Sequence, residues 1–317
     1  MNASPGRQET SRDADRWIGR VIASRYRLVE RLGAGTGGRV FRAVSLESGA
    51  DVALKVVEAQ ADPDDGEEAF LGRGATAMRL DHPGIARMLD FGFDEDGVRY
   101  VVMERVEGQA LDAVLRAKKR FDAPSTVEIA LQLAAALRHV HAAGLVHRDL
   151  KPSNVLLSRA PDGAARVTLL DFGIATSPGA GGAAGMQGSP AYAAPGQASG
   201  EAADPRDDVY GLGVIVYELA TGRLPFDGGS SIDVVLRHLR EAPKPPRMVV
   251  GTIPPRLEAA ILRALEKERG ARFQSMDEWI AALESIRDEL ARDEPPDRSV
   301  AEWMNDAWSR FARLVGF

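Results

Sequence analysis

Apolar and polar positions alternate in short runs over the first third of the chain. YRLVERL, RVFRAV and VALKVV combine apolar and β-branched residues with turn residues between the runs, and VRYVVMERV follows the turn sequence GFDEDG. Short runs of this kind, bounded by turn residues, are typical of β-strands. Helical spacing is confined to the neighbourhood of residues 67–80. The pattern therefore predicts that residues 26–105 are mostly β-strand, with one helix among the strands.

The pattern changes to helical spacing after Gly108. STVEIALQLAAALRHVHAAG places apolar residues on one helical face and predicts a C-terminal cap at Gly144. Two short strands, NVLLS and RVTLLD, follow it. We predict four later helices, which lie in DVYGLGVIVYELATG, SIDVVLRHL, PRLEAAILRALE and SMDEWIAALESIRDELA. The expected fold class is α+β with two lobes, a β-rich N-lobe at 21–105 and a helical C-lobe at 106–292, joined near 104–108.

The two ends of the chain have a different character. Residues 1–20 are mostly polar and are expected to form a flexible leader, and DEPPDRS at 293–299 has the composition of a linker. Apolar residues recur at spacings of three and four over 300–317, which predicts an amphipathic helix with an aromatic face. Such a face favours docking on the chain's own C-lobe, a contact with a partner or a second copy, or a membrane surface.

Composition narrows the classes of protein. The 317 residues carry a formal charge of −6 and are 44% hydrophobic, which suits a globular protein with a sizeable core. The absence of cysteine excludes disulfides and cysteine-ligated metals. The chain has no long basic tract of the kind that binds nucleic acid. No apolar run is long enough to span a bilayer, and the N-terminus lacks the apolar core of a secretion signal. We expect a cytoplasmic protein without nucleic-acid partners or a transmembrane segment.

A glycine-rich stretch, GAGTGGRV at 33–40, lies between two predicted strands. Glycines let backbone N–H groups approach phosphates closely, because no Cβ intervenes. A dinucleotide-binding loop would open a helix, whereas a strand follows here. Lys55 lies in the next strand, VALKVV. The alternatives are a flexible hairpin with an edge-strand charge and a phosphate-binding loop with a neutralising lysine.

Two further motifs favour the second alternative. HRDLKPSN occupies 147–154, and DFG follows at 171–173. Phosphoryl transfer needs a carboxylate that orients the attacking hydroxyl, cations near the transferring group, and metal ions that neutralise phosphate oxygens. Asp149 can orient the hydroxyl, Lys151 can contact the γ-phosphate, and Asn154 with Asp171 can hold magnesium. A surface charge cluster is a poor alternative, because DFG follows, with Asp171 seventeen residues beyond Asn154.

With these motifs in order, the chain resembles a bacterial Hanks-type, or eukaryotic-like, serine/threonine protein kinase from about residue 26 to about residue 290. The resemblance implies that Asp149, Lys151 and Lys55 are catalytic and that Asn154 and Asp171 hold the metal. It places Met103 at the gatekeeper position. The residues that the resemblance assigns to ATP binding are Leu32, Gly33, Gly35, Gly38, Val40, Ala53, Lys55, Met103, Glu104, Val106 and Leu156.

The resemblance implies further roles in the C-lobe. Asp208 matches an aspartate that braces the catalytic loop from a buried helix, and GSPAY at 188–192 resembles a substrate-facing loop. Small-molecule phosphotransferases share the overall architecture but usually lack Arg148 and Lys151 in this arrangement. Arg148 could pair with a phosphate placed on the activation segment. The hydroxyls on or near this segment are those of Thr176, Ser177, Ser189 and Ser199.

The sequence departs from the family pattern at two glutamates. The helix near 67–80 usually carries a glutamate that pairs with the strand lysine, but that position is Arg73, or Gly74 after a shift of one residue. Glu67 and Glu68 are the nearest carboxylates. The family's Ala-Pro-Glu motif is Ala-Pro-Gly here, ending at Gly196, so Arg272 needs another acceptor or must face water. Glu201 is a candidate substitute.

Two functions remain open. The first is an ATP-dependent, non-specific serine/threonine protein kinase that transfers the γ-phosphate to protein hydroxyls in bacterial signalling, with ATP and Mg²⁺ as cofactors and Mn²⁺ as an alternative metal. The second is a pseudokinase-like module that binds nucleotide or a partner and transfers phosphate weakly or not at all. The expected partners are ATP and a protein substrate that the sequence does not name. The N-lobe helix and 300–317 are candidate contacts for an activating partner or a second copy.

Overall fold

The computed structural model describes residues 16–35, 38–57, 66–159, 165–171 and 189–292. The chain divides into two compact units. One, here called the β unit, comprises residues 1–61 and 88–105, and the other, the helical unit, comprises residues 62–87 and 106–317. The linker expected at 293–299, the helix expected at 300–317 and most of the leader lie outside the described residues.

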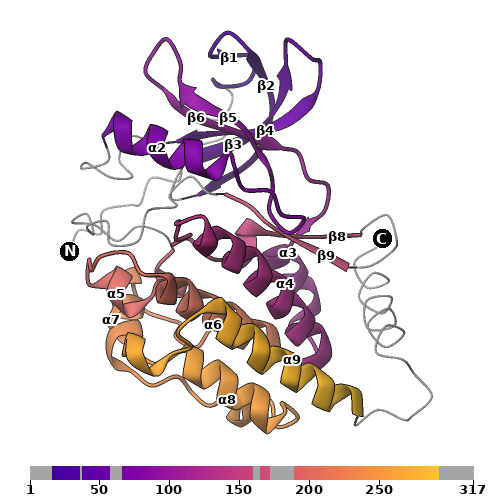
Figure 1. The fold of residues 1–317 in the computed structure, drawn as a ribbon, viewed down its shortest axis with the longest axis vertical. Coiled ribbons are helices and arrows are strands. Elements are labelled where there is room, and N and C mark those ends of the chain that lie inside the picture. The colour runs from indigo at the N-terminus through magenta and orange to yellow at the C-terminus, as the bar shows by residue number, and fades with distance from the viewer. Residues whose placement is uncertain (1–15, 36–37, 58–65, 160–164, 172–188, 293–317) are drawn as a thin grey trace, which may run out of the picture. The chain divides into compact units, whose positions relative to one another are not determined.

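A six-stranded antiparallel sheet forms the β unit, with strand order β1-β2-β3-β4-β6-β5 (Figure 1). Most neighbouring strands are joined by short connections, as the spacing of turn residues predicts. The bounds of these strands are β1 Val21–Ile22, β2 Tyr26–Gly35, β3 Gly38–Ser45, β4 Asp51–Val57, β5 Met88–Phe93 and β6 Arg99–Glu104.

One face of this sheet carries the core of the β unit. Phe41, Leu54 and Val102 are completely buried in one apolar cluster. Trp17 belongs to the same cluster with 8% of its surface exposed, and its ring lies 6.3 Å from that of Phe41. The packed chain therefore begins before residue 21 and takes in part of the expected flexible leader, because Trp17 gains burial that a mobile segment would lose.

The helical unit contains the helices and a second, three-stranded antiparallel sheet of order β7-β8-β9 (Figure 1). Among the described residues, none of its helices is both long enough and apolar enough to cross a membrane. Its elements are α2 Glu67–Ala77, β7 Gln109–Ala110, α3 Leu111–Lys118, α4 Ala123–Ala142, β8 Val155–Arg159, β9 Ala165–Leu169, α5 Pro195–Ala198, α6 Pro205–Thr221, α7 Ser231–Arg240, α8 Pro255–Ala264 and α9 Met276–Arg292. Short 3-10 turns are η1 Pro152–Asn154, η2 Pro190–Tyr192, η3 Pro246–Met248 and η4 Arg269–Ala271.

Residues 62–87, which include α2, group with the helical unit rather than with the β-rich lobe expected from the sequence. Backbone bonds explain this difference. The Leu169 N–H donates to the Gly84 carbonyl at 2.9 Å, and the Ala86 N–H donates to the Leu169 carbonyl at 3.0 Å. The segment after α2 is thus tied to β9, a pairing between distant residues that periodicity does not reveal.

The helix ends follow the predicted capping chemistry. Asp122 accepts from the Ser125 N–H at the start of α4, and Gly144 adopts a φ of +75° just after its end, which confirms the predicted stop. At the start of α6, Asp204 and Asp207 form a reciprocal capping box, and Gly222 ends the helix with a φ of +72°. These caps fix α6 at both ends within the core of the helical unit.

Helix α7 is attached to η2 through a buried histidine. His238 is fully buried, and its Nε2 lies 3.0 Å from the Ala191 carbonyl while its Nδ1 lies 2.8 Å from the Tyr210 hydroxyl. Because a carbonyl only accepts, Nε2 donates and Nδ1 accepts from Tyr210, as in a neutral imidazole. Burial, with the nearby charge of Lys267, lowers the pKa of His238 to about 4.

This histidine predicts an acid-sensitive fold. The pKa of His238 falls from 6.5 when unfolded to about 4 when folded. The unfolded chain therefore binds the proton first, so the contribution to stability is present above pH 6.5 and is lost as the pH falls toward 4. At about 1.4 kcal/mol per pH unit, we expect a loss on the order of 2–3 kcal/mol between about pH 7 and pH 4.5.

Urea unfolding of the wild type and of His238→Gln at both pH values measures this loss. The glutamine retains a donor and an acceptor but does not titrate, so the variant should lose less stability on acidification. His139→Gln, at a half-buried position on α4, is the matched control. Equal acid dependence in the wild type and His238→Gln would contradict the assignment.

Candidate active site

Lys55 lies on the face of the β-unit sheet opposite to its apolar core. In β4, Val52, Leu54 and Val56 point into that core, so Ala53 and Lys55 point to the other face. Strand pairing places Val40 opposite Lys55 and Met103 opposite Ala53. Four residues predicted to contact ATP thus share one face of the sheet. Lys55 itself is buried, with 3% of its surface exposed.

The glycine-rich stretch forms the tip of the β2–β3 hairpin, where Gly35 pairs with Gly38. Thr36 and Gly37 lie outside the described residues. Gly38 has a φ of +133°, and a Cβ at this position would lie 2.0 Å from the Val56 carbonyl oxygen. Only glycine fits here, because both the backbone conformation and the close approach of β4 exclude a side chain. Gly33 lies in β2, and Leu32 beside it is 49% exposed.

In the helical unit, Asp149 lies at the centre of the HRDLKPSN loop. Its Oδ2 accepts from Lys151 Nζ at 2.6 Å and from Asn154 Nδ2 at 3.1 Å. Asn154 Nδ2 also donates to the Asp149 carbonyl at 2.9 Å. Asp149 is 5% exposed, and its buried Oδ1 accepts no hydrogen bond from any residue that the structure describes. The loop therefore fixes one carboxylate oxygen and leaves the other available to a hydroxyl.

Asp208, at the start of α6, braces this loop. Its Oδ2 accepts from the His147 N–H at 2.8 Å, and its Oδ1 accepts from the Arg148 N–H at 2.9 Å. His141 of α4 lies 2.8 Å from the same Oδ2. Burial opposes the charge on this carboxylate, but its bonds to His141 and to the loop outweigh that effect, and the pKa of Asp208 lies below its usual value.

Asp171 comes just after β9. It directly follows Leu170, which bonds to the catalytic loop. The Leu170 N–H donates to the Asn154 carbonyl at 2.8 Å, and the Leu170 carbonyl lies 3.1 Å from His147 Nε2. Both Arg148 and Asp171 adopt left-handed backbone conformations, with φ values of 61° and 64°. Such conformations are costly for residues other than glycine, and they persist where surrounding contacts impose them. Phe172 and Gly173 lie outside the described residues.

Asn154 and Asp171 have the chemistry of a magnesium site. The amide nitrogen of Asn154 is used by Asp149, so the atom that Asn154 can offer to a cation is its amide oxygen. Asp171 supplies a carboxylate. Magnesium at phosphate-binding sites is commonly held by one or two such oxygen ligands together with phosphate oxygens and water. The residues present therefore fit this ion.

Two residues that sequence reasoning did not single out hold the loop in place. Gln197 is 5% exposed, and its side chain donates to the Arg148 carbonyl at 2.7 Å. His141 supports Asp208, as described above. The separations along the chain, 49 residues between Gln197 and Arg148 and 67 between His141 and Asp208, explain why no local pattern indicated them.

The position of Arg73 on α2 departs from the family pattern. The buried face of this helix is formed by Phe70, Gly74 and Ala77, and Arg73 beside it is half-buried. Glu67 and Glu68 are exposed and lie in the first turn, where the helix dipole favours acidic residues. The structure therefore gives these two glutamates the position expected of helix N-terminal acids.

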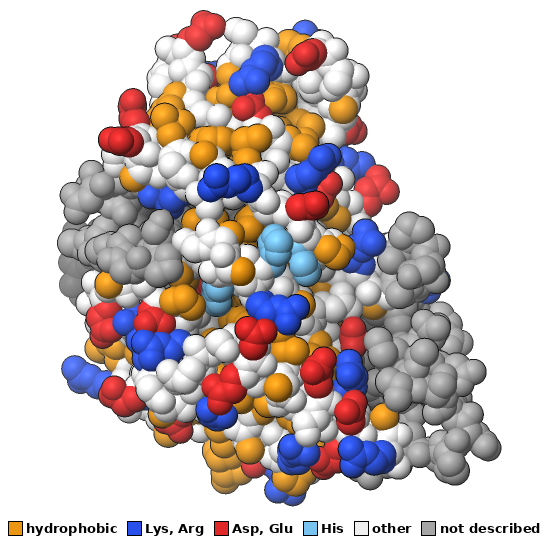
Figure 2. Space-filling view, in the orientation of Figure 1, with side chains coloured by type: hydrophobic (Ala, Val, Ile, Leu, Met, Phe, Trp, Pro, Cys, Tyr) orange, Lys and Arg blue, Asp and Glu red, His pale blue; other side chains and the backbone are white. Residues whose placement is uncertain are grey.

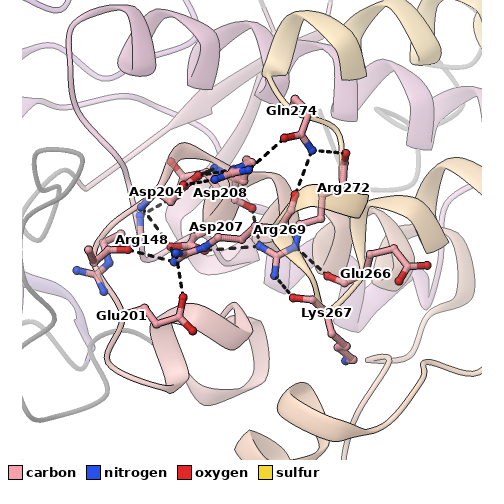
Figure 3. Close-up of polar contacts among 12 residues, drawn as sticks. Arg148, Glu201, Asp204, Asp207, Asp208, Glu266, Lys267, Arg269, Arg272 and Gln274 are labelled. Atoms are coloured by element: carbon pink, nitrogen blue, oxygen red, sulfur yellow. Dashed lines mark hydrogen bonds and ion pairs between the residues drawn. The ribbon is translucent and has the colours of Figure 1, made fainter.

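The second departure, at Gly196, is accompanied by a different ion-pair network (Figure 3). Arg272 is fully buried and donates to the carbonyls of Arg206, Glu266 and Lys267 at 2.8–2.9 Å. Its guanidinium also lies 3.5 Å from Asp207. Glu201, the substitute considered from sequence, instead pairs with Arg269 at 3.0 Å. Arg272 thus finds other acceptors and does not face water.

A pocket of about 670 Å³ lies beside the catalytic loop. It includes Lys151 and Ser153 from the loop and Ser189 and Tyr192 from the segment predicted to face the substrate. The Tyr192 hydroxyl donates to Glu218 at 2.7 Å, which fixes η2 on α6. The remaining lining residues are Asp112, Leu115, Arg116, Lys119, Pro152, Glu218 and Gly222.

The predicted site residues thus fall into two groups, each within one unit. Those of the helical unit lie on the catalytic loop and on the strands that follow it: Asp149, Lys151, Asn154, Leu156 in β8, and Asp171 after β9, with Val106 at the unit's boundary. Those of the β unit lie on β2, β3, β4 and β6, and Glu104 ends β6 at the last strand position before the boundary.

On the face drawn in Figure 2, Lys and Arg side chains are interspersed with Asp and Glu side chains over the lower part of the described molecule. This distribution differs from the single-sign patch that a phosphate backbone attracts. It agrees with the mild net charge of −6.

Comparison with known proteins gives the same family as the motifs. The protein kinase domain model matches residues 26–302. The serine/threonine-protein kinase pkn3 of Myxococcus xanthus is 38% identical over 298 residues, which cover 90% of this chain and 54% of pkn3. PknA of Mycobacterium tuberculosis is 36% identical over 278 residues, which cover 85% of this chain and 63% of PknA.

A solved structure has the same fold. The crystal structure of the Mycobacterium tuberculosis PknI kinase domain matches with a TM-score of 0.67 and 28% identity, covering 84% of this chain and 98% of that domain. The chain spans about half the length of pkn3 and less than two thirds of PknA. From the match over residues 26–302 and from these relatives, we conclude that the chain belongs to the protein kinase family, among the bacterial Hanks-type serine/threonine kinases.

Proposed function

We propose that this chain is an ATP-dependent serine/threonine protein kinase that transfers the γ-phosphate of ATP to a protein hydroxyl. The observation that carries the proposal is the way in which the two carboxylate oxygens of Asp149 are bonded. Its Oδ2 is fixed by Lys151 and Asn154, while its buried Oδ1 accepts no hydrogen bond from the described residues. A carboxylate held in this way suits a substrate hydroxyl as its missing donor.

The residues of the loop divide the chemistry among them. Asp149 orients the attacking hydroxyl and accepts its proton. Lys151, 2.6 Å from Asp149, places a positive charge where negative charge develops on the transferring group. Asn154 and Asp171 would hold a magnesium ion, which supplies neutralising charge to the phosphate oxygens when it is bound. In the β unit, the sheet face that carries Lys55 would bind ATP.

A protein substrate would approach along the pocket beside Lys151. Ser189 and Tyr192 line this pocket together with the loop, which supports the proposed substrate-facing role of this segment. Lys151 in the sequence DLKPSN favours serine or threonine over tyrosine by the family resemblance.

Arg73 is the observation that favours a second function, in which the chain binds nucleotide or a partner and transfers little phosphate. Because a glutamate normally holds the strand lysine toward the phosphates, Arg73 favours low intrinsic activity. We propose that the kinase is active at a reduced rate and that a partner acting on α2 would raise it.

Replacing Asp149 with asparagine tests the proposed chemistry. We expect kcat to fall about 100- to 10,000-fold, because asparagine cannot accept the proton. The affinity for Mg-ATP should change little. Phosphate transfer to a generic protein substrate measures the first quantity, and binding of a fluorescent ATP analogue measures the second.

Asp277→Asn, the same substitution at an exposed position of α9, is the control and should keep wild-type activity. Equal, background-level transfer by the wild type and Asp149→Asn would reject the kinase. ATP binding in that case would support the non-transferring module.

Substitution of Arg73 by glutamate tests the departure on α2. If position 73 is where the family glutamate lies, Arg73→Glu restores the family residue at that position, and we expect kcat/KM for ATP to rise about three- to tenfold. Arg79→Glu makes the same charge change at an exposed position after α2 and should have no such effect. Steady-state kinetics of both variants against the wild type decide the outcome. No gain, or an equal gain in both, would contradict this alignment.

A further inference from the structure

The space beside Gly196, which a side chain at this position would occupy, is filled by an arginine. The residue is buried in α5, and a Cβ built on it would lie 2.3 Å from Nη2 and 2.8 Å from Cζ of Arg269. It would also lie 3.0 Å from Glu201 Oε2. Any side chain at position 196 must therefore displace the Arg269 guanidinium.

Arg269 joins the segment around α5 to the start of α6 (Figure 3). It donates to both oxygens of Asp207, from Nε at 3.1 Å and from Nη2 at 2.8 Å. Its Nη1 lies 3.0 Å from Glu201, and Nη2 also donates to the Ala202 carbonyl at 3.1 Å. The bidentate contact with the completely buried Asp207 carboxylate has the fork geometry that a lysine cannot reproduce.

The segment that Arg269 holds also touches the catalytic loop. The Glu201 N–H donates to the Gly196 carbonyl at 2.8 Å, which ties the residue paired with Arg269 to α5. The next residue of α5, Gln197, donates to the Arg148 carbonyl, and Arg148 immediately precedes Asp149. A continuous set of contacts therefore runs from Arg269 through α5 to the backbone beside the candidate catalytic carboxylate.

We propose that Arg269 is a positioning residue for phosphoryl transfer, and that it replaces the missing glutamate at position 196 by anchoring α5 to Asp207. The proposal rests on the proposed kinase function. The contact is reversed relative to the family pattern: here the cation enters the space beside α5, and the buried carboxylate comes from α6. Gly196 is then required because it leaves room for Arg269.

Arg269→Ala tests the anchor. With the anchor lost, α5 and the loop backbone at Arg148 are held less firmly, and we expect kcat for a protein substrate to fall about tenfold, since small misplacements of positioning groups are costly. The KM for ATP should stay within about twofold, because the contacts run to the catalytic loop rather than to the residues of the β unit predicted to bind ATP. Arg256→Ala, which removes a pair with Glu289 on the surface, is the matched control and should keep the wild-type kcat.

A double-mutant cycle separates positioning from general loss of stability. Gly196→Ala should lower kcat in the wild type, because its methyl group displaces Arg269, but should have little effect in the Arg269→Ala background. Gly270→Ala, in the same turn as Arg269, adds a Cβ that meets no atom within 4 Å and serves as its control. All assays are made well below the melting temperature of each variant. Additive effects of the two substitutions, or an equal loss with Gly270→Ala, would overturn the proposal.

Hydrogen exchange distinguishes failure of this proposal from failure of the kinase. The backbone amides of 196–201 and 147–149 should exchange faster in Arg269→Ala than in the wild type and Arg256→Ala. If the wild type transfers no more phosphate than Asp149→Asn, the proposed function fails, while faster exchange would still support the anchor. Unchanged exchange together with unchanged kcat in Arg269→Ala would reject the anchor.

Discussion

The buried carboxylate of Asp208 holds the backbone on which the candidate chemistry depends. It accepts from two consecutive loop N–H groups, those of His147 and Arg148, and lies within hydrogen-bond distance of His141. A buried charge is tolerated only where several donors compensate its desolvation. The compensation here comes from the loop and from His141, so a change that weakens these bonds should affect both the start of α6 and the geometry of Asp149.

Two consecutive aspartates have separate roles at this terminus. Asp208 binds the loop that precedes the chemistry, while Asp207 binds Arg269 and Arg272, which come much later in the chain. Burial raises the pKa of Asp207, and the two arginines oppose that effect. The departure from the family at Gly196 is therefore accommodated by neighbouring charges. On α2, the acidic residues Glu67 and Glu68 are exposed and lie more than a turn from Arg73.

The sequence predicted much of this arrangement because the relevant signals are local. The apolar and β-branched residues of VALKVV predicted the strand that carries Lys55, and the order of HRDLKPSN and DFG indicated the residues proposed for one site. The bond from Gln197 to Arg148 and the space beside Gly196 could not be predicted, since they depend on how distant segments pack. The grouping of α2 with the helical unit could not be predicted for the same reason, as its links to β9 are backbone bonds that carry no sequence signature.

The left-handed backbone at Arg148 and Asp171 has a consequence for engineering this protein. Each conformation costs about 1–2 kcal/mol for a residue with a side chain, and glycine would remove that cost. Replacing either residue with glycine would relieve the backbone but would also remove its side-chain interactions, and at position 171 it would remove a candidate metal-binding carboxylate. Stabilising this scaffold while keeping its chemistry requires changes elsewhere, for example on the exposed faces of α8 and α9.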